Sequence, residues 1–221
     1  MTTLIPPKNP NSPVAPTQYD ARYQDQLSSV LRLYFNTIDN GLGSLYGPNG
    51  GQYINNPHIA ASDSTDQYAT AANTPTVVNW NTMSTGSGFT LNAPGSATAD
   101  VAGVYKITYS AQLANTDNAA HDAVFWLRVN GTDVADSATI FTIVARKSAG
   151  VPSYVCGYSE AVFTVQAGDV VELIWATDAA ATSGGALGVH IFQDPAITLP
   201  YVRPAVPSVI GSITFVSSVA A

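Results

Sequence analysis

Charged residues are scarce in this sequence. They make up 10% of its 221 residues, against roughly 25% in an ordinary soluble domain. The 8 Lys and Arg are outnumbered by the 15 Asp and Glu, so the net charge is −7 and no basic surface exists for a phosphate backbone. The composition therefore predicts that nucleic acid is not a partner.

Long apolar runs are missing as well. No stretch approaches the about 20 apolar residues that a membrane-spanning helix needs, so membrane insertion is not expected. Residues 1–16 also lack the basic start and the apolar centre of a secretory signal. Synthesis in a reducing cytoplasm fits this pattern.

Cysteine and histidine are too few for the common metal and nucleophile motifs. Cys156 is the single cysteine, which excludes an intrachain disulfide, and its strand-like surroundings predict a small buried side chain. His58, His121 and His190 are far apart, and none has a second ligand at metal spacing. The polar loop 115–123 around His121 is expected to be solvated. The sequence thus predicts no enzyme, no cofactor and no metal site.

Proline is concentrated at the N-terminus. Residues 1–18 contain five prolines and almost no periodic apolar pattern, which indicates an extended arm. Such an arm is either a disordered tail or a segment that becomes ordered along a neighbouring subunit. The second interpretation is favoured here.

One strong helix signal follows, over residues 19–41. Thr17, with Asp20 three residues later, resembles a capping box, and Gly41 offers a left-handed stop. The apolar stripe of this expected assembly helix consists of Tyr23, Leu27, Leu31, Tyr34 and Ile38. Burial of four such side chains gives about 6–12 kcal/mol. Ordering some twenty residues costs more, at roughly 1–2 kcal/mol each, so the helix must pack on its own domain, on symmetry mates or on another protein.

The rest of the chain reads as a connection and a β domain. Residues 42–74 are rich in Gly, Asn and Ser and predict an irregular connection. Residues 75–221 contain eight or nine short β-branched or aromatic segments between turn residues, which predicts a jelly-roll β-sandwich. The fold class is therefore mainly β, a sandwich preceded by an arm and one helix.

Two features of the β domain bear on its packing. Asn130-Gly131 matches a two-residue hairpin turn, which outweighs its match to a glycosylation acceptor because no secretory signal is present. Tyr105, Tyr109 and Trp175 are strand aromatics that either fill the core or line a trimer seam.

The succession "AGVYKITYSAQL", "FWLRVNGTDVADS", "VFTVQAGDVVELIWAT" and "LGVHIF" resembles the globular-head domain of complement and tumour-necrosis-factor-like proteins. The final "RPAVPSVIGSITFV" and the arm-plus-helix start look like the versions carried by tailed-bacteriophage virion proteins. The domain resemblance covers roughly residues 75–218 and implies a homotrimer that presents loops. It transfers no ligand-binding residues, because the loops are where such domains differ.

The function expected from this resemblance is a homotrimeric capsid decoration or head-fibre protein of a phage virion. Its arm and helix would attach it to major capsid or tail proteins. The alternative is a tail fibre or receptor-binding protein that recognises a host-surface glycan or receptor. A soluble sugar-binding trimer and a polysaccharide depolymerase are further hypotheses; the latter needs two carboxylates, for which Asp133, Asp136 and Glu160 are candidates.

Overall fold

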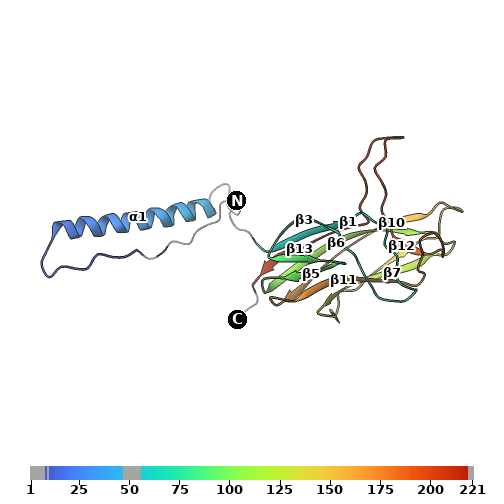
Figure 1. Ribbon diagram of the computed structural model, residues 1–221, viewed down its shortest axis with the longest axis horizontal. Coiled ribbons are helices and arrows are strands. Elements are labelled where there is room, and N and C mark those ends of the chain that lie inside the picture. Colours follow the sequence, from blue (N-terminus) through green and yellow to red (C-terminus); the bar gives the residue numbers. More distant parts are fainter. Residues whose placement is uncertain (1–7, 9, 47–55, 219–221) are drawn as a thin grey trace. The chain divides into compact units, whose positions relative to one another are not determined.

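The computed structural model describes residues 8, 10–46 and 56–218. The chain divides into two compact units, residues 1–55 and residues 56–221. Figure 1 shows a helical first unit and a β second unit, and each is described by itself.

The first unit contains helix α1, which begins at Ala21 and ends at Tyr46. Asp20 caps the helix, because its Oδ1 accepts a hydrogen bond from the backbone N–H of Arg22 at 2.8 Å. The expected cap at Thr17 is therefore wrong. The Asp20 carboxylate accepts from one of the N–H groups that the first turn leaves without a partner, which is the role expected of Thr17.

The expected helix end at Gly41 is also wrong, since α1 continues for another five residues to Tyr46. An interior glycine costs about 1 kcal/mol relative to alanine, which the neighbouring helix formers Leu42 and Leu45 offset in part. In the sequence, Tyr46 is followed by Gly47 and Pro48, which are stronger signals for a helix end.

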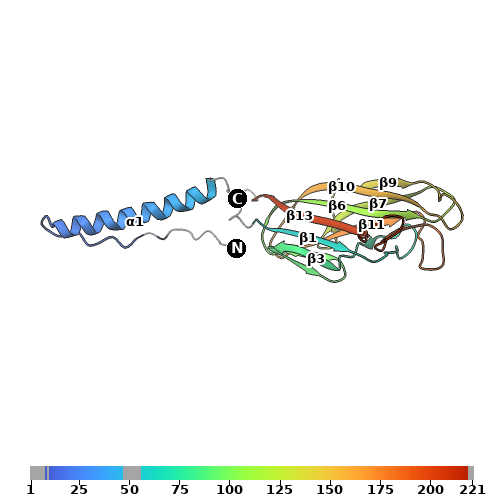
Figure 2. The ribbon, with the colours of Figure 1, turned by 90° about the horizontal axis from the view of Figure 1, so that it is seen from above.

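Residues 10–20 form neither helix nor strand and run back alongside α1 (Figures 1 and 2). Asn11 and Val30 line the same shallow surface hollows between this segment and the helix. The role of the segment in attachment stays a prediction.

The second unit is built from strands that alternate along the chain between two antiparallel sheets within residues 56–218. The strands of sheet A are β1 (His58–Asp63), β3 (Thr82–Ser87), β6 (Gly103–Asn115), β10 (Ser153–Val165), β12 (Val189–Ile191) and β13 (Val209–Ser217). The strands of sheet B are β2 (Thr76–Val77), β4 (Phe89–Asn92), β5 (Ser96–Ala99), β7 (His121–Val129), β8 (Thr132–Asp133), β9 (Thr139–Ile143) and β11 (Val170–Thr177).

The strand order is that of a jelly roll. Sheet A runs β10-β6-β13-β1-β3, with β12 also on β6, and sheet B runs β4-β5-β11-β7-β8, with β2 on β11 and β9 on β7. The chain crosses between the sheets from β5 to β6, from β6 to β7, and again on either side of β10 and β11. This confirms the predicted jelly-roll β-sandwich.

Strand β1 lies inside the segment 42–74 that was expected to be an irregular connection, so the β unit starts earlier than predicted. Its sequence HIAASD has small side chains and little apolar signal. The strand forms because it is paired on both sides, with β3 and, along its length, with β13, where His58 lies opposite Thr214 and Asp63 opposite Val209. The residues of β1 themselves carry no sequence signal for a partner strand as distant as β13.

The core lies between the two sheets and follows the alternation predicted for β6. Tyr105, Ile107, Tyr109, Ala111 and Leu113 are all buried, while the residues between them are partly exposed. The turn between β7 and β8 also forms as predicted. Asn130 and Gly131 have φ values of 49° and 77°, the left-handed values that an Asn-Gly hairpin turn requires.

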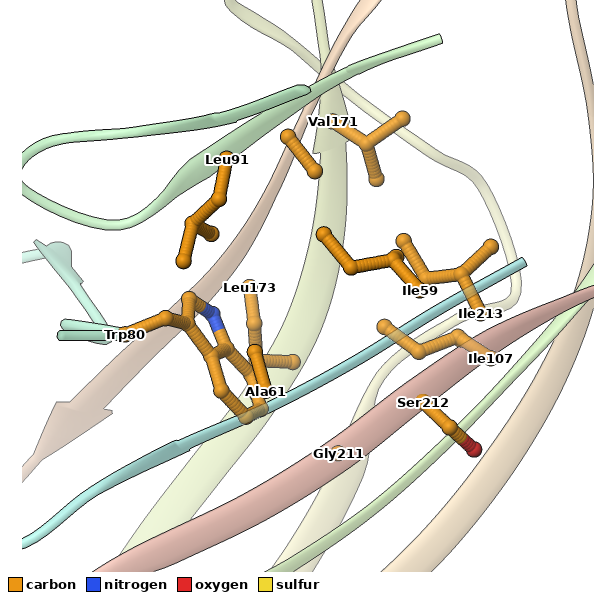
Figure 3. Close-up of a pocket in the computed structure, with 11 residues that line it drawn as sticks. Ile59, Ala61, Trp80, Leu91, Ile107, Val171, Leu173, Gly211, Ser212 and Ile213 are labelled. Atoms are coloured by element: carbon orange, nitrogen blue, oxygen red, sulfur yellow. The ribbon is translucent and has the colours of Figure 1, made fainter. Parts of the chain in front are cut away.

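Trp80 packs closely against Gly211 of β13. A Cβ on Gly211 would come within 2.3 Å of Trp80 Cη2, so the indole ring takes the place of a side chain on β13. Behind the ring is a cavity of about 30 Å³ with a largely apolar lining that includes Ile59, Leu91 and Leu173 (Figure 3). Its volume corresponds to a water molecule or two, which makes it a packing gap and not a ligand site.

Candidate assembly interface

The outer face of sheet A is the surface of β10, β6 and β13 that points away from the core. Apolar side chains stand on this face in contact with solvent. Tyr158 and Val162 on β10 are 59% and 62% exposed. The further members of the set are Tyr154, Ile210 and Val216. A solvated sheet face normally carries polar residues, so this pattern indicates a surface made for contact.

The strand register shows how these residues are arranged. Ser110 on β6 lies opposite both Tyr158 of β10 and Ile210 of β13, so the three form one row across the sheet. In the next outward-facing row, Thr108 lies between Glu160 and Ser212 and shares a hydrogen bond of 2.9 Å with Ser212. The face therefore combines apolar side chains on its two flanking strands with small hydroxyl side chains, such as those of Ser110, Thr108 and Ser212.

The charges of this part of the face neutralise each other. Lys106 Nζ lies 2.8 Å from Glu160 Oε2. Hydrogen bonding to Glu160 raises the pKa of Lys106, and hydrogen bonding to Lys106 lowers the pKa of Glu160. Such a pair leaves no net charge to oppose the approach of an identical face.

Cys156 also stands on the outer face of sheet A, where its side chain is exposed. The prediction that it is a small buried residue is wrong. In the segment 153–165, apolar residues occupy both alternating sets of positions, and the register with β6 turns the set that contains Phe163 inward. Apolar residues on both faces of a strand are a sequence signal that the outer face is also a contact surface, but the sequence does not show which set faces the core.

The aromatics expected in the core or at a trimer seam are all buried inside one chain. Tyr105 and Trp175 are completely buried and Tyr109 nearly so. Burial raises the pKa of Tyr109 to about 12, so its hydroxyl, which has no hydrogen-bond partner, stays neutral. These rings fill the core of the sandwich. The sequence did not predict the outward-facing residues of β10, Tyr158 and Val162, as candidates for an interface.

The stripe expected on the helix lies along one side of α1. Tyr23, Leu27, Tyr34 and Ile38 are half-buried, and Leu31 is exposed. Beyond the stripe, Leu33, Phe35 and Leu42 are also exposed. The helix thus presents more apolar surface than the predicted stripe alone.

His121 lies in a small polar cluster at one end of the sandwich. Its Nε2 is 3.0 Å from Asp117 Oδ2, and its Nδ1 is 3.2 Å from Asp178 Oδ2. Burial acts to lower the pKa of His121, but the two carboxylates outweigh it and the pKa is raised. Because carboxylates engage both ring nitrogens, neither nitrogen is left to take a proton from a nucleophile. The cluster holds loops together, and the prediction of a merely solvated loop missed it.

The other two histidines, His190 and His58, pack against or bond to neighbouring groups of the sandwich. His190 is buried on β12, stacked on Tyr68 with ring centroids 5.2 Å apart, and burial lowers its pKa. Its Nδ1 has no hydrogen-bond partner. His58 begins β1, and its Nδ1 lies 2.8 Å from the carbonyl oxygen of Asn56.

The carboxylates considered for polysaccharide cleavage do not suit a general acid. Hydrogen bonding to Arg128 lowers the pKa of Asp133, and Lys106 does the same for Glu160. A general acid needs a raised pKa. Asp136 sits in a turn with a φ of 59°.

Two features of the described residues bear on ligands and membranes. Within residues 8, 10–46 and 56–218, no three side chains of His, Cys, Asp or Glu gather in a way that would hold a metal ion. In the same part of the chain, α1 lacks the length of apolar sequence required to cross a bilayer.

No family model matches the chain, and no curated protein matches it either. Among solved structures, it is similar to the tumour-necrosis-factor protein Eiger of S. frugiperda, at 14% identity and a TM-score of 0.44, over 74% of this chain and 96% of that one. It is also similar to the globular domain of zebrafish complement 1qA protein, at 13% identity and a TM-score of 0.40, over 74% and 99% of the two chains. The fold rests on the strand order itself, and the resemblance to phage proteins stays a prediction.

Proposed function

We propose that this chain is a non-enzymatic structural component of a bacteriophage virion. It acts as a homotrimeric capsid decoration or head-fibre protein, attached through its N-terminal arm and helix, that displays the jelly-roll unit. The observation that carries the proposal is the outer face of sheet A, with exposed Tyr158, Val162 and Ile210 around a neutral centre.

Self-association is the first part of the proposal. Burying exposed Tyr, Val and Ile side chains gives roughly 1.5–3 kcal/mol each, and the Lys106–Glu160 pair leaves the face without net charge. A cyclic trimer uses the same pair of complementary surfaces on every copy, and a neutral, partly apolar face is suited to be one of them. The number three comes from the resemblance to globular-head domains.

Attachment is the second part. Helix α1 carries exposed Leu33, Phe35 and Leu42, and residues 10–20 beside it have no regular structure of their own. Both features suit a segment that gains order and buries apolar surface on another protein. A virion shell, which offers many identical sites, would also multiply weak contacts through effective concentration.

The alternative is a tail fibre or receptor-binding protein, and one observation favours it. Tyr154 is half-exposed, its ring lies 4.9 Å from that of Phe192, and Lys147 Nζ is 6.0 Å from its centroid. An exposed aromatic ring beside a cation is suited to a sugar ring. In that case Tyr154→Ala abolishes adsorption of particles to host cells even where light scattering still finds the assembled protein on them.

Copy number and Cys156 reactivity test self-association. Light scattering during gel filtration of the full chain should give three times the chain mass. Cys156 should react slowly with N-ethylmaleimide at high protein concentration and quickly on dilution. Tyr158→Asp should give a folded monomer, whereas Ile140→Asp, a matched change on exposed β9 of sheet B, should leave the trimer intact. A chain that stays monomeric at all concentrations would overturn the proposal.

Particle incorporation tests the virion role. Immunogold labelling of particles of the encoding phage should locate the protein on the head. Deletion of residues 1–46 should abolish incorporation and leave a folded β unit. Particles without the protein should break at lower temperature, while loss of adsorption with an intact shell would favour the tail-fibre alternative.

A further inference from the structure

A hairpin between β12 and β13 stands out from the sandwich. Asp194 and Val206 exchange backbone hydrogen bonds of 3.1 and 2.7 Å, and Ile197 and Arg203 exchange bonds of 3.2 and 3.0 Å. Figure 1 shows this segment rising from the sandwich on the side of sheet A, away from sheet B. Residues 194–206 are called the projecting hairpin below.

The stem of the projecting hairpin is held in shape by one arginine. The guanidinium of Arg203 pairs with the carboxylate of Asp194 and donates hydrogen bonds to the carbonyl oxygens of Pro195, at 3.2 Å, and Pro204, at 3.1 Å. Prolines within the segment further restrict the backbone. A hairpin fixed in this way loses little conformational entropy on binding, because its shape exists beforehand.

The tip of the projecting hairpin is apolar. Leu199, Tyr201 and Val202 are 82%, 63% and 81% exposed. Residues 195–202 contain no charged side chain. Loop tips are normally polar and rich in turn residues, so three large apolar side chains at a rigid, exposed tip indicate a contact with another molecule.

We propose that the projecting hairpin is a clasp that packs its apolar tip against a neighbouring copy of this chain. The inference rests on the proposed self-association and names an additional contact in it. The hairpin leaves the sandwich on the side of the outer face of sheet A, where a neighbour would lie (Figure 1). Both surfaces are apolar and uncharged overall, which makes them complementary in chemistry.

A lipid surface fits the tip less well than a second copy. Segments that bind membranes by an apolar tip gain affinity from Lys and Arg nearby and from Trp at the interface. The single cation of the projecting hairpin, Arg203, is already paired with Asp194, and the net charge of the chain is −7. The tip therefore lacks the electrostatic attraction to anionic lipids.

The test compares the full chain with the variant Leu199→Ser, Tyr201→Ser, Val202→Ser. Sedimentation velocity over a dilution series gives the concentration at which half of the protein is dissociated. The triple variant should raise it about tenfold or more, because burial of the tip is lost. Ile140→Ser, an equally exposed apolar residue on sheet B, is the matched control and should not change it. Thermal melts at concentrations where all three are dissociated should agree, since the substituted residues are on the surface.

A photo-crosslinking amino acid at position 201 tests directly whether the tip contacts a neighbouring copy. Crosslinks should join two copies, and peptide mapping should place the second end on a neighbouring chain. An oligomer that is unchanged in the triple variant and gives no crosslink between copies would overturn the clasp and leave self-association standing. A wild-type chain that never associates would overturn both. Binding of the wild type to phosphatidylcholine vesicles that is lost in the triple variant, with the oligomer unaffected, would assign the tip to a membrane instead.

Discussion

The helical unit and the β unit place their apolar side chains in opposite ways. In the sandwich, Tyr105, Phe125 and Trp175 are completely buried by the chain's own strands. In helix α1, Leu33 and Phe35 are more than half exposed. The difference shows that the β unit carries its own stabilisation, whereas the helical unit leaves much of the apolar surface of α1 uncovered within itself.

Separation of the two units gives the largest expected effect. A fragment of residues 56–221 should fold, with a cooperative transition within about 0.5 kcal/mol of that of the full chain. A fragment of residues 1–55 should be largely unfolded, because isolated helices gain most of their stability from packing. Circular dichroism measures both, and trifluoroethanol should restore helix to the second fragment as a control. A fragment 1–55 that is stably helical at low concentration would contradict the comparison.

Single substitutions in the two units should differ nearly as sharply. Trp175→Ala should lower the free energy of unfolding of the β unit by about 3–5 kcal/mol, because it empties the space beside Phe125, whose ring lies 6.0 Å away. Leu33→Ala, an exposed helix residue, should change it by less than about 0.5 kcal/mol. Urea titration followed by Trp fluorescence, with circular dichroism for the Trp175 variant, measures both. Equal effects would mean that the helix belongs to the same core.

The contact between Trp80 and β13 offers an intermediate test. Gly211→Ala should cost about 1–3 kcal/mol, since the new methyl group would lie against the indole ring and force it to move. Thr214→Ala, exposed on the same strand, is the control. The double variant Gly211→Ala, Trp80→Ala should lose less free energy of unfolding than the sum of the losses in the two single variants. Strict additivity would rule out this contact as the cause.

The pH dependence of the β unit should show the smallest effect. The pKa of His121 is raised in the fold, so its contribution is fully present below the unfolded value of about 6.5 and is lost as pH rises through the folded pKa. His121→Asn should therefore destabilise more at pH 5.5 than at pH 8, by less than about 1 kcal/mol. His58→Asn, whose ring bonds to a backbone carbonyl, is the control. A larger loss at pH 8 would contradict the role of the two carboxylates.

Much of the fold could be predicted from the sequence, because local alternation decides which side of a strand is buried. Strand β6 has apolar residues on one side and polar residues on the other, and its buried set is the predicted one. Strand β1 has mostly small side chains and forms through pairing with β13, which lies some 150 residues away in the chain. Pairing at that distance has no local sequence signal.

The candidate interface was harder to predict for the same physical reason. The segment 153–165 has apolar residues on both sides, so only its register with β6 decides that Tyr158 points outward and Phe163 inward. The sequence analysis did not predict the projecting hairpin, because nothing in its apolar residues, such as Leu199 and Tyr201, marks them as exposed. The exposure of a side chain depends on which other segments of the chain pack over it, and the local sequence does not show this.

The pairing of β1 with β13 also has an architectural consequence. Because His58 lies opposite Thr214, the chain enters and leaves the sandwich side by side. A unit with adjacent entry and exit can be spliced as a cassette into a surface loop of an unrelated protein, or cut and rejoined in a new order, without disturbing either sheet.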